Sequence, residues 1–165
     1  MQPLAHYIEL FRAGTLVKSV ACPVLIWNDP PEATAEETPT FTREMDTYGK
    51  PKRTRSAVVF ELTGAVAGGP ALTLGRGAAC SVHLHEESVS RAHAELASTP
   101  HGWTAVDLGS RNGTWVGKAR MPPGAPTRVS DGDRLQLGNV ELFFMMPESF
   151  QSYLSQMTRR ETQSP

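Results

Sequence analysis

Two stretches with helical periodicity flank a central region whose apolar residues follow a β pattern. The N-terminal stripe recurs at a spacing of three and four residues and consists of Leu4, Tyr7, Ile8 and Phe11. The C-terminal stripe comes after Pro147 and consists of Phe150, Tyr153, Leu154 and Met157. These spacings predict one amphipathic helix near each end of the chain, the first of them ended by Gly14.

Between Ala57 and Met146 the apolar residues occur in short runs that are rich in β-branched and aromatic side chains. The predicted strands are 57–63, 71–74, 81–84, 92–97, 103–108, 114–116, 134–137 and 140–146. Turn-forming sequences such as Asn112-Gly113 and Gly138-Asn139 separate these runs, and no helical pattern interrupts them. The sequence therefore predicts an all-β sandwich of short antiparallel strands, with short helical segments at both chain ends.

Residues 20–27 form an apolar run of strand length, but Pro23 cannot donate a hydrogen bond to a neighbouring strand. We therefore expect an edge strand or an extended segment there. Residues 28–56 combine prolines, threonines and separate acidic and basic stretches, which predicts a flexible linker. The predicted domains are an N-terminal helix plus extended segment (1–27), the linker (28–56), the sandwich (57–146) and a C-terminal amphipathic helix with a tail (147–165).

The composition fits one soluble globular domain with appendages. The chain has 165 residues, 39% hydrophobic and 20% charged, and a formal net charge of −1. This balance argues against a nucleic-acid partner or a membrane partner, so any anion site must be local. Cys22 and Cys80 are too few for a disulfide framework and are expected to be small buried residues. No stretch has the pattern of a secretion signal or a membrane span, which predicts a cytoplasmic protein.

Three short polar strings lie where predicted strands run into loops. They are Gly75-Arg76, Ser90-Arg91-Ala92-His93 and Ser110-Arg111-Asn112-Gly113-Thr114. Arginine, hydroxyl and amide groups suit an anionic ligand held by charge-assisted hydrogen bonds. The guanidinium of Arg76 can bond two oxygens of such an anion at once, which a lysine cannot do.

Catalytic and metal-binding alternatives fit these residues poorly. Ser90 and His93 lie across a junction between a loop and a strand, with no third group to orient the histidine, so we expect no enzyme activity. His83 and His85 share one face of a strand but have no third ligand nearby in sequence. We therefore expect neither a metal site nor a cofactor.

The ordered set of Leu74-Gly75-Arg76, then 88–94, then 107–114 resembles the forkhead-associated (FHA) domain of bacterial proteins, over about residues 57–146. The resemblance implies a reader of phosphothreonine peptides. The phosphopeptide-binding residues that it implies are Arg76, Ser90, Arg91, Arg111 and Asn112. The residues that it implies as structural support of the site are Gly75, His93 and Gly113. Asn112 corresponds to the family asparagine that holds the ligand backbone.

Three positions depart from the common family pattern. Arg111 replaces a frequent threonine, so a long cation stands where a hydroxyl often contacts phosphate. Ser88 stands where some members carry an arginine that reads an acidic ligand residue, so that preference is not expected here. Ser81 replaces a frequent asparagine or aspartate.

The function expected from this pattern is phosphothreonine-peptide binding in signalling downstream of, or alongside, a Ser/Thr protein kinase. The alternative is a phosphate-independent scaffold that uses the sandwich and the terminal helices as protein contacts. The helical stripes are expected to pack within the molecule, with a dimer or partner face as the other possibility. Phosphorylation of Thr38, Thr40 or Thr42 would create an intramolecular ligand, against the simpler interpretation of a plain spacer.

Overall fold

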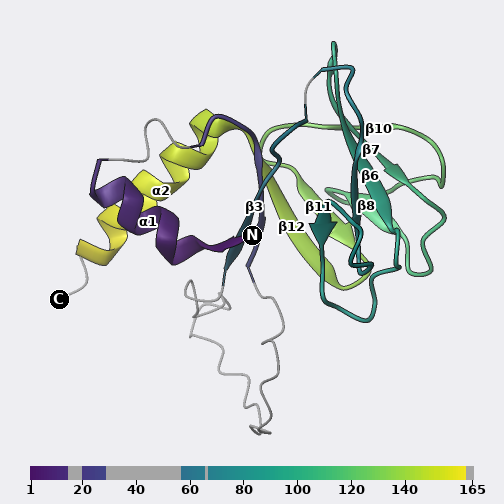
Figure 1. Ribbon diagram of the computed structural model, residues 1–165, viewed down its shortest axis with the longest axis horizontal. Helices are drawn as coiled ribbons and strands as arrows, with labels where there is room; N and C mark the ends of the chain where they lie inside the picture. Colours follow the sequence, from purple (N-terminus) through teal and green to yellow (C-terminus); the bar gives the residue numbers. More distant parts are fainter. Residues whose placement is uncertain (15–19, 29–56, 66, 163–165) are drawn as a thin grey trace, which may run out of the picture.

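The computed structural model describes residues 1–14, 20–28, 57–65 and 67–162. Two β-sheets face each other, and a pair of helices lies on the outer side of one sheet (Figure 1). The predicted linker from residue 29 onward, with Thr38, Thr40 and Thr42, lies outside the described residues. The predicted all-β sandwich with helices at both chain ends is confirmed.

The larger sheet has seven strands in the order β1-β3-β2-β12-β11-β8-β9, and all neighbours pair antiparallel. Its strands are β1 (Gln2–Pro3), β2 (Val24–Trp27), β3 (Val58–Glu61), β8 (Thr114–Val116), β9 (Ala119–Arg120), β11 (Arg134–Leu137) and β12 (Val140–Met145). Segments from both ends of the chain therefore build one sheet.

The smaller sheet has five strands in the order β10-β7-β6-β4-β5. Its strands are β4 (Leu72–Gly75), β5 (Val82–His83), β6 (Ala94–Thr99), β7 (Gly102–Asp107) and β10 (Thr127–Val129). The pair β4 and β5 is parallel, in contrast to the expected antiparallel pairing, and the other pairs are antiparallel. Because β4 and β7 both pair antiparallel with β6, these two strands end at the same edge of the sheet.

The edge position predicted for residues 20–27 is wrong, because β2 lies between β3 and β12 in the interior of the larger sheet. Pro23 precedes the strand, so its missing N–H costs no bond in the ladder, and its carbonyl accepts a bond from Leu62 N–H at 2.9 Å. Leu25 and Trp27 point into the core between the sheets, whereas Val24 and Ile26 face the helices. A strand buried on both faces explains the uninterrupted apolar sequence.

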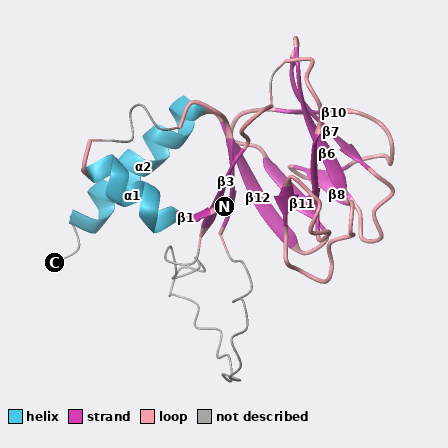
Figure 2. Cartoon of the chain, in the orientation of Figure 1, coloured by secondary structure: helices cyan, strands magenta, loops and turns pink. Residues whose placement is uncertain are grey.

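The helices are α1 (Leu4–Arg12) and α2 (Pro147–Thr162), and both cover the outer face of the larger sheet (Figure 2). Their stripes are used within the molecule, as expected. Tyr7 and Phe150 meet edge to face, with ring centroids 5.5 Å apart. The second apolar core consists of Leu4, Tyr7, Ile8, Val20, Val24, Ile26, Ala57, Val59, Phe150 and Leu154.

Both helices are also fixed at one end by polar contacts. Gly14, with φ of +68°, follows the end of α1 and donates its N–H to the Phe11 carbonyl. The Asp131 carboxylate, in the loop before β11, accepts bonds from the N–H of Met146 and the hydroxyl of Ser149 at the start of α2. In the described part of the chain, neither helix is long and apolar enough to cross a membrane.

Candidate functional site

Three loops meet at one edge of the smaller sheet because of its strand directions. Leu74 in β4 pairs with Ala94 at the start of β6, and Ala94 pairs with Asp107 at the end of β7. The loop after β4, the loop before β6 and the loop after β7 therefore emerge together. They carry the three polar strings of the sequence, which the fold brings to one place.

His93 connects two of these loops through both of its ring nitrogens. The Ser90 N–H donates to Nδ1 at 3.0 Å, so the ring proton lies on Nε2, which donates to the Gly113 carbonyl at 3.0 Å. The side chain is fully buried, and its backbone N–H and carbonyl bond to Leu74 and Leu108. His93 is thus a buried, neutral side chain that links the loop before β6 to the turn before β8.

Asp107 organises the loop after β7, although the sequence pattern gave it no role. One carboxylate oxygen accepts the N–H groups of Gly109 and Ser110 at 2.8 and 2.9 Å. The other oxygen accepts the hydroxyls of Ser110 and Thr114 at 2.6 and 2.5 Å. Ser110 Oγ in turn accepts the Gly113 N–H at 3.0 Å, so this buried carboxylate determines the path of residues 107–114.

The buried environment shifts the pKa of two of these groups. Burial lowers the pKa of His93 below its ordinary 6.5, against the opposing effects of the Gly113 carbonyl and the Asp107 charge. Burial alone would raise the pKa of Asp107, but the bonds from Ser110 and Thr114 outweigh it and hold the pKa below the ordinary 3.8. Both shifts favour the neutral ring and the ionised carboxylate of the folded state.

We expect the protein to lose stability on acidification in two ranges. Between each ordinary pKa and the lower folded pKa, the unfolded chain binds more protons than the folded one. Stability from His93 is therefore complete above about pH 6.5 and declines as the pH falls through its folded pKa, and that from Asp107 declines below about pH 3.8. Urea unfolding at pH 7.5 and 5.5 should show a smaller pH effect in His93→Gln than in the wild type. An equal pH effect in both proteins would contradict the assignment to His93.

Arg76 follows β4 directly and is exposed. Its backbone N–H bonds to the Ser90 carbonyl at 2.9 Å, and its side-chain Nε bonds to the Val89 carbonyl at 3.3 Å. This second bond fixes the direction of the guanidinium, while its terminal nitrogens have no bonded partner among the described residues. Arg76 can therefore offer a preoriented pair of donors to an anion.

Ser90 lies beside Arg76 and is half buried. Its Oγ accepts the N–H of Arg111 at 3.1 Å, which joins the loop before β6 to the loop after β7. The hydroxyl hydrogen of Ser90 has no acceptor in the described part of the molecule. Ser90 thus supplies a short donor from a residue whose backbone bonds to that of Arg76.

Asn112 and Ser88 close the other side of the site. Asn112 Nδ2 donates to the Ser88 carbonyl at 2.7 Å, and the Asn139 N–H in the turn between β11 and β12 donates to Ser88 Oγ at 2.8 Å. Ser88 also bonds through its N–H and hydroxyl to the Glu86 carboxylate. Ser88, one of the three positions that depart from the family pattern, therefore connects three loops. The side-chain oxygen of Asn112 stays available to a ligand.

Glycines permit the close approach of these loops. Gly113, with φ of +84°, adopts a backbone conformation that other residues rarely tolerate, and its carbonyl accepts bonds from His93 and from Gly138 N–H. Gly75 meets the Arg91 backbone, since an added Cβ would lie 2.3 Å from the Arg91 carbonyl oxygen. Gly75 and Gly113 thus allow the loops to pack closely, and neither offers a side chain to a ligand.

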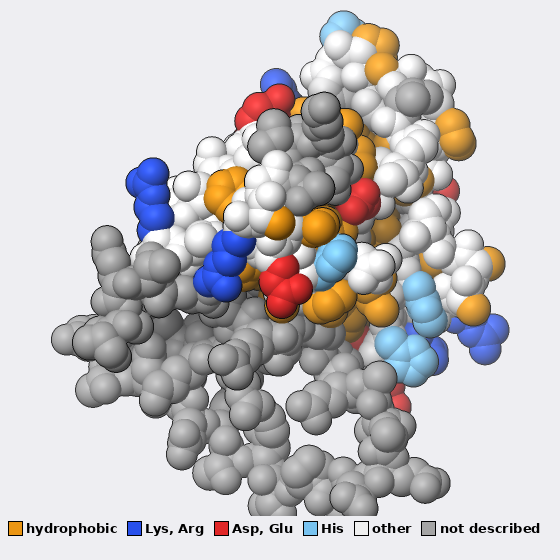
Figure 3. Space-filling model, turned by 60° about the vertical axis from the view of Figure 1, so that its left-hand side comes forward, with side chains coloured by type: hydrophobic (Ala, Val, Ile, Leu, Met, Phe, Trp, Pro, Cys, Tyr) orange, Lys and Arg blue, Asp and Glu red, His pale blue; other side chains and the backbone are white. Residues whose placement is uncertain are grey.

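The side chains of Arg91 and Arg111 are exposed at the same edge, with no carboxylate partner among the described residues. Their backbones take part in the framework: the Arg91 carbonyl accepts the Gly77 N–H and the Cys80 thiol. Cys22 and Cys80 are partly exposed, not buried as expected, and both are free thiols. On the face shown in Figure 3, Lys and Arg side chains are dispersed, so a broad basic surface is absent from that view.

His83 also contributes to the site, by a contact that the sequence did not indicate. Its Nε2 lies 3.1 Å from the Arg76 carbonyl oxygen, and its ring meets His85 edge to face at 5.5 Å between centroids. The described residues contain no cluster of three metal-ligating side chains. In this structure His83 supports the Arg76 loop.

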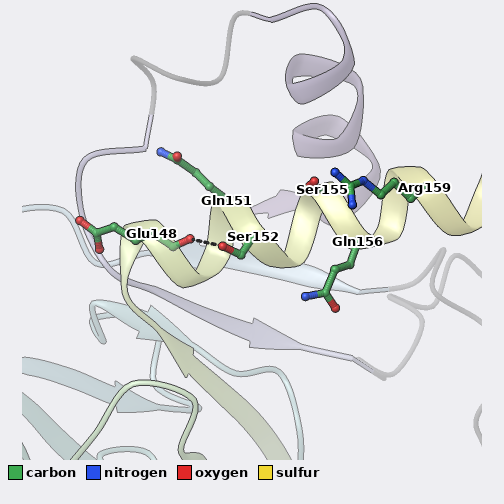
Figure 4. A pocket seen from close by; sticks show the side chains of 6 residues that line it. All are labelled: Glu148, Gln151, Ser152, Ser155, Gln156 and Arg159. Atoms are coloured by element: carbon green, nitrogen blue, oxygen red, sulfur yellow. Dashed lines mark hydrogen bonds between the residues drawn. The ribbon is translucent and has the colours of Figure 1, made fainter.

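Two hollows of the surface lie along α2. Figure 4 shows a polar one whose lining residues all project from that helix: Glu148, Gln151, Ser152, Ser155, Gln156 and Arg159. An apolar one between α2 and the larger sheet is lined by Ile26, Asn28, Phe143, Met145, Tyr153 and Met157. The three converging loops contribute no lining residue to either hollow.

Comparisons with known proteins agree with this geometry. Residues 72–138 match the family model of the FHA domain. The "Oxoglutarate dehydrogenase inhibitor" of Corynebacterium diphtheriae is 36% identical over 76 residues, which are 46% of this chain and 51% of that protein. The chain therefore spans about half the length of this relative.

Solved structures share the fold at lower sequence identity. The solution structure of the FHA domain of an Arabidopsis thaliana hypothetical protein has a TM-score of 0.51 and 18% identity, and covers 77% of this chain and 87% of that one. Mycobacterium tuberculosis EmbR, solved in complex with a low affinity phosphopeptide, has a TM-score of 0.50 and 19% identity, and covers 86% of this chain and 29% of that one.

Proposed function

We propose that this chain, in which residues 72–138 match the family model of the FHA domain, binds phosphothreonine-containing peptides and acts without an enzymatic step of its own. The observation that carries the proposal is the juxtaposition of Arg76, Ser90 and Asn112 at one edge of the smaller sheet. Their free donor and acceptor atoms match a phosphate group followed by a peptide backbone.

The chemistry assigns a separate role to each of the three. A phosphothreonine carries between one and two negative charges near neutral pH and three acceptor oxygens. The terminal nitrogens of Arg76 bind two of the oxygens, and the Ser90 hydroxyl donates to the phosphate. The side-chain oxygen of Asn112 accepts a backbone N–H of the ligand. Arg91 and Arg111 add positive charge at the rim, where ion pairs contribute little individually.

The rigid framework supports this proposal in energetic terms. His93, Ser88 and Asp107 hold the loops through bonds that exist before any ligand arrives. A ligand therefore binds without the entropic cost of ordering these loops. The same proposal places the protein downstream of, or alongside, a Ser/Thr kinase, because such a kinase makes the phosphothreonine.

The test is binding of a degenerate peptide library in three forms, with threonine, phosphothreonine or phosphoserine at the fixed position. We expect phosphothreonine to be preferred, and Arg76→Ala to weaken its binding by about 2 kcal/mol, or roughly thirtyfold. Arg128→Ala is the matched control, since Arg128 is an exposed arginine on β10, where it pairs with Thr104 in β7 away from the site. Equal binding of threonine and phosphothreonine peptides would favour the phosphate-independent scaffold instead.

We further propose that a phosphothreonine at Thr38, Thr40 or Thr42 would compete for the same site. A tethered ligand acts at a high effective concentration, so even a poor sequence match would compete with free peptide. In the same assay, kinase treatment of the whole chain should weaken peptide binding. The variant with alanine at all three threonines should keep its affinity after treatment; a similar loss in that variant would contradict the proposal.

A further inference from the structure

Arg120 is an exposed arginine beside the turn that carries Asn112. No sequence motif marks this arginine. It lies on β9, opposite Trp115 of β8, and its guanidinium carbon is 5.5 Å from the centroid of the Trp115 ring. A Cβ added to Gly113 would lie 2.8 Å from its Nε and 2.9 Å from its Nη2. The guanidinium therefore occupies the space that glycine leaves open, directly after Asn112.

Packing restricts this side chain without neutralising it. Contact with an aromatic ring on one side and a glycine backbone on the other reduces the number of rotamers it samples. No carboxylate bonds to Arg120 in the described part of the chain, whereas the partly exposed Arg134 pairs with Glu141 at 2.8 Å. A cation that is held in place but unpaired is prepared for an anion from outside the molecule.

The position of Arg120 differs from that of Arg76, the arginine proposed to bind phosphate. Arg76 approaches the site from β4 of the smaller sheet, whereas Arg120 approaches from β9, at the edge of the larger sheet. Asn112 lies in the turn between them. A peptide whose phosphate contacts Arg76 and Ser90, and whose backbone contacts Asn112, would continue past Asn112 toward Arg120.

We propose that Arg120 determines specificity by binding an acidic side chain of the ligand that flanks the phosphothreonine. The inference rests on the proposed function, because it takes the phosphate and the ligand backbone to be placed as described there. The ligand class is thus a phosphothreonine peptide with an aspartate or glutamate at one flanking position. The acidic preference proposed here does not involve Ser88, whose side chain carries no charge.

The experiment compares phosphothreonine peptides that are identical except for one glutamate, moved in turn through each flanking position and replaced there by glutamine in the control. For the wild type we expect glutamate at one position to bind about three- to tenfold more tightly than glutamine. Arg120→Gln should remove that preference and leave the affinity for the glutamine peptides unchanged. Arg120→Glu should reverse it, so that the glutamine peptide binds more tightly than the glutamate peptide, and Arg128→Gln should behave as the wild type.

The outcomes separate the two proposals. If no phosphothreonine peptide binds the wild type, the proposed function itself fails. If peptides bind in a phosphate-dependent manner but glutamate gives no preference at any position, only the role of Arg120 is overturned. Equal weakening of glutamate and glutamine peptides by Arg120→Gln, with unchanged thermal unfolding, would also overturn it, because Arg120 would then act on the phosphate.

Discussion

Replacement of His93 by alanine is expected to lower the free energy of unfolding by about 3 kcal/mol. The fully buried ring bonds to the Ser90 N–H and the Gly113 carbonyl, so its removal leaves the Ser90 N–H without its partner and opens a cavity. The Gly113 carbonyl loses one of its two bonds and keeps the one from Gly138 N–H. Both partners belong to the loops of the site, and we expect phosphopeptide affinity to fall as well. Urea denaturation and peptide titration measure the two effects.

His83→Ala is the matched control for this prediction. His83 also contacts a backbone group of the site, the Arg76 carbonyl, but its side chain is exposed and water can replace the lost bond. Its replacement should change the free energy of unfolding by no more than about 0.5 kcal/mol. Similar destabilisation by the two substitutions would mean that His93 does not link the two loops in the way that we describe.

Gly75→Ala is expected to destabilise the protein by about 2 to 3 kcal/mol and to weaken phosphopeptide binding strongly. The added methyl group would lie 2.3 Å from the Arg91 carbonyl oxygen and 3.0 Å from Cys80 Sγ. The clash is with backbone, so the loop before β6 must move away from β4. That movement separates Arg76 from Ser90, whose backbone groups bond across the same gap.

A graded comparison with Gly77 makes this prediction sharper. A Cβ at Gly77 faces the same Arg91 oxygen, but at 2.9 Å, so a smaller shift relieves the contact. We therefore expect Gly77→Ala to cost less stability and less affinity than Gly75→Ala. Unfolding curves and peptide titrations of the two variants provide the measurement. A larger effect at Gly77 would contradict the proposed packing of these loops.

The sequence was most informative where local patterns and chemistry agree. Short apolar runs separated by turn residues correctly predicted most strands of both sheets, and two helical stripes predicted α1 and α2. The strings around Arg76, Ser90 and Asn112 were expected to meet, and the antiparallel pairing of β4, β6 and β7 brings them together. These predictions depended on residues close in sequence or on a recognisable ordered motif.

The remaining features depend on contacts between distant segments, which no local pattern contains. The strands β1, β9 and β10 have two or three residues each, too few for a periodicity, and exist because a neighbouring strand accepts them. Pro23 suggested an edge position for β2, and that prediction is wrong because the proline lies just outside the strand. Asp107 and Arg120 acquire their positions only when the turn at Gly113 has formed.

The interior place of β2 has a consequence for how the chain folds. Residues 24–27 pair on one side with residues 58–61 and on the other with residues 142–145, near the opposite end of the sequence. The pairing of the larger sheet therefore cannot be completed until β12 has been synthesised. Much of this pairing joins residues far apart in the sequence, so its contact order is high. Such topologies fold slowly compared with helical bundles. Until β2 and β12 pair with each other, the facing edge of each strand stays unpaired, and unpaired strand edges of this kind favour aggregation.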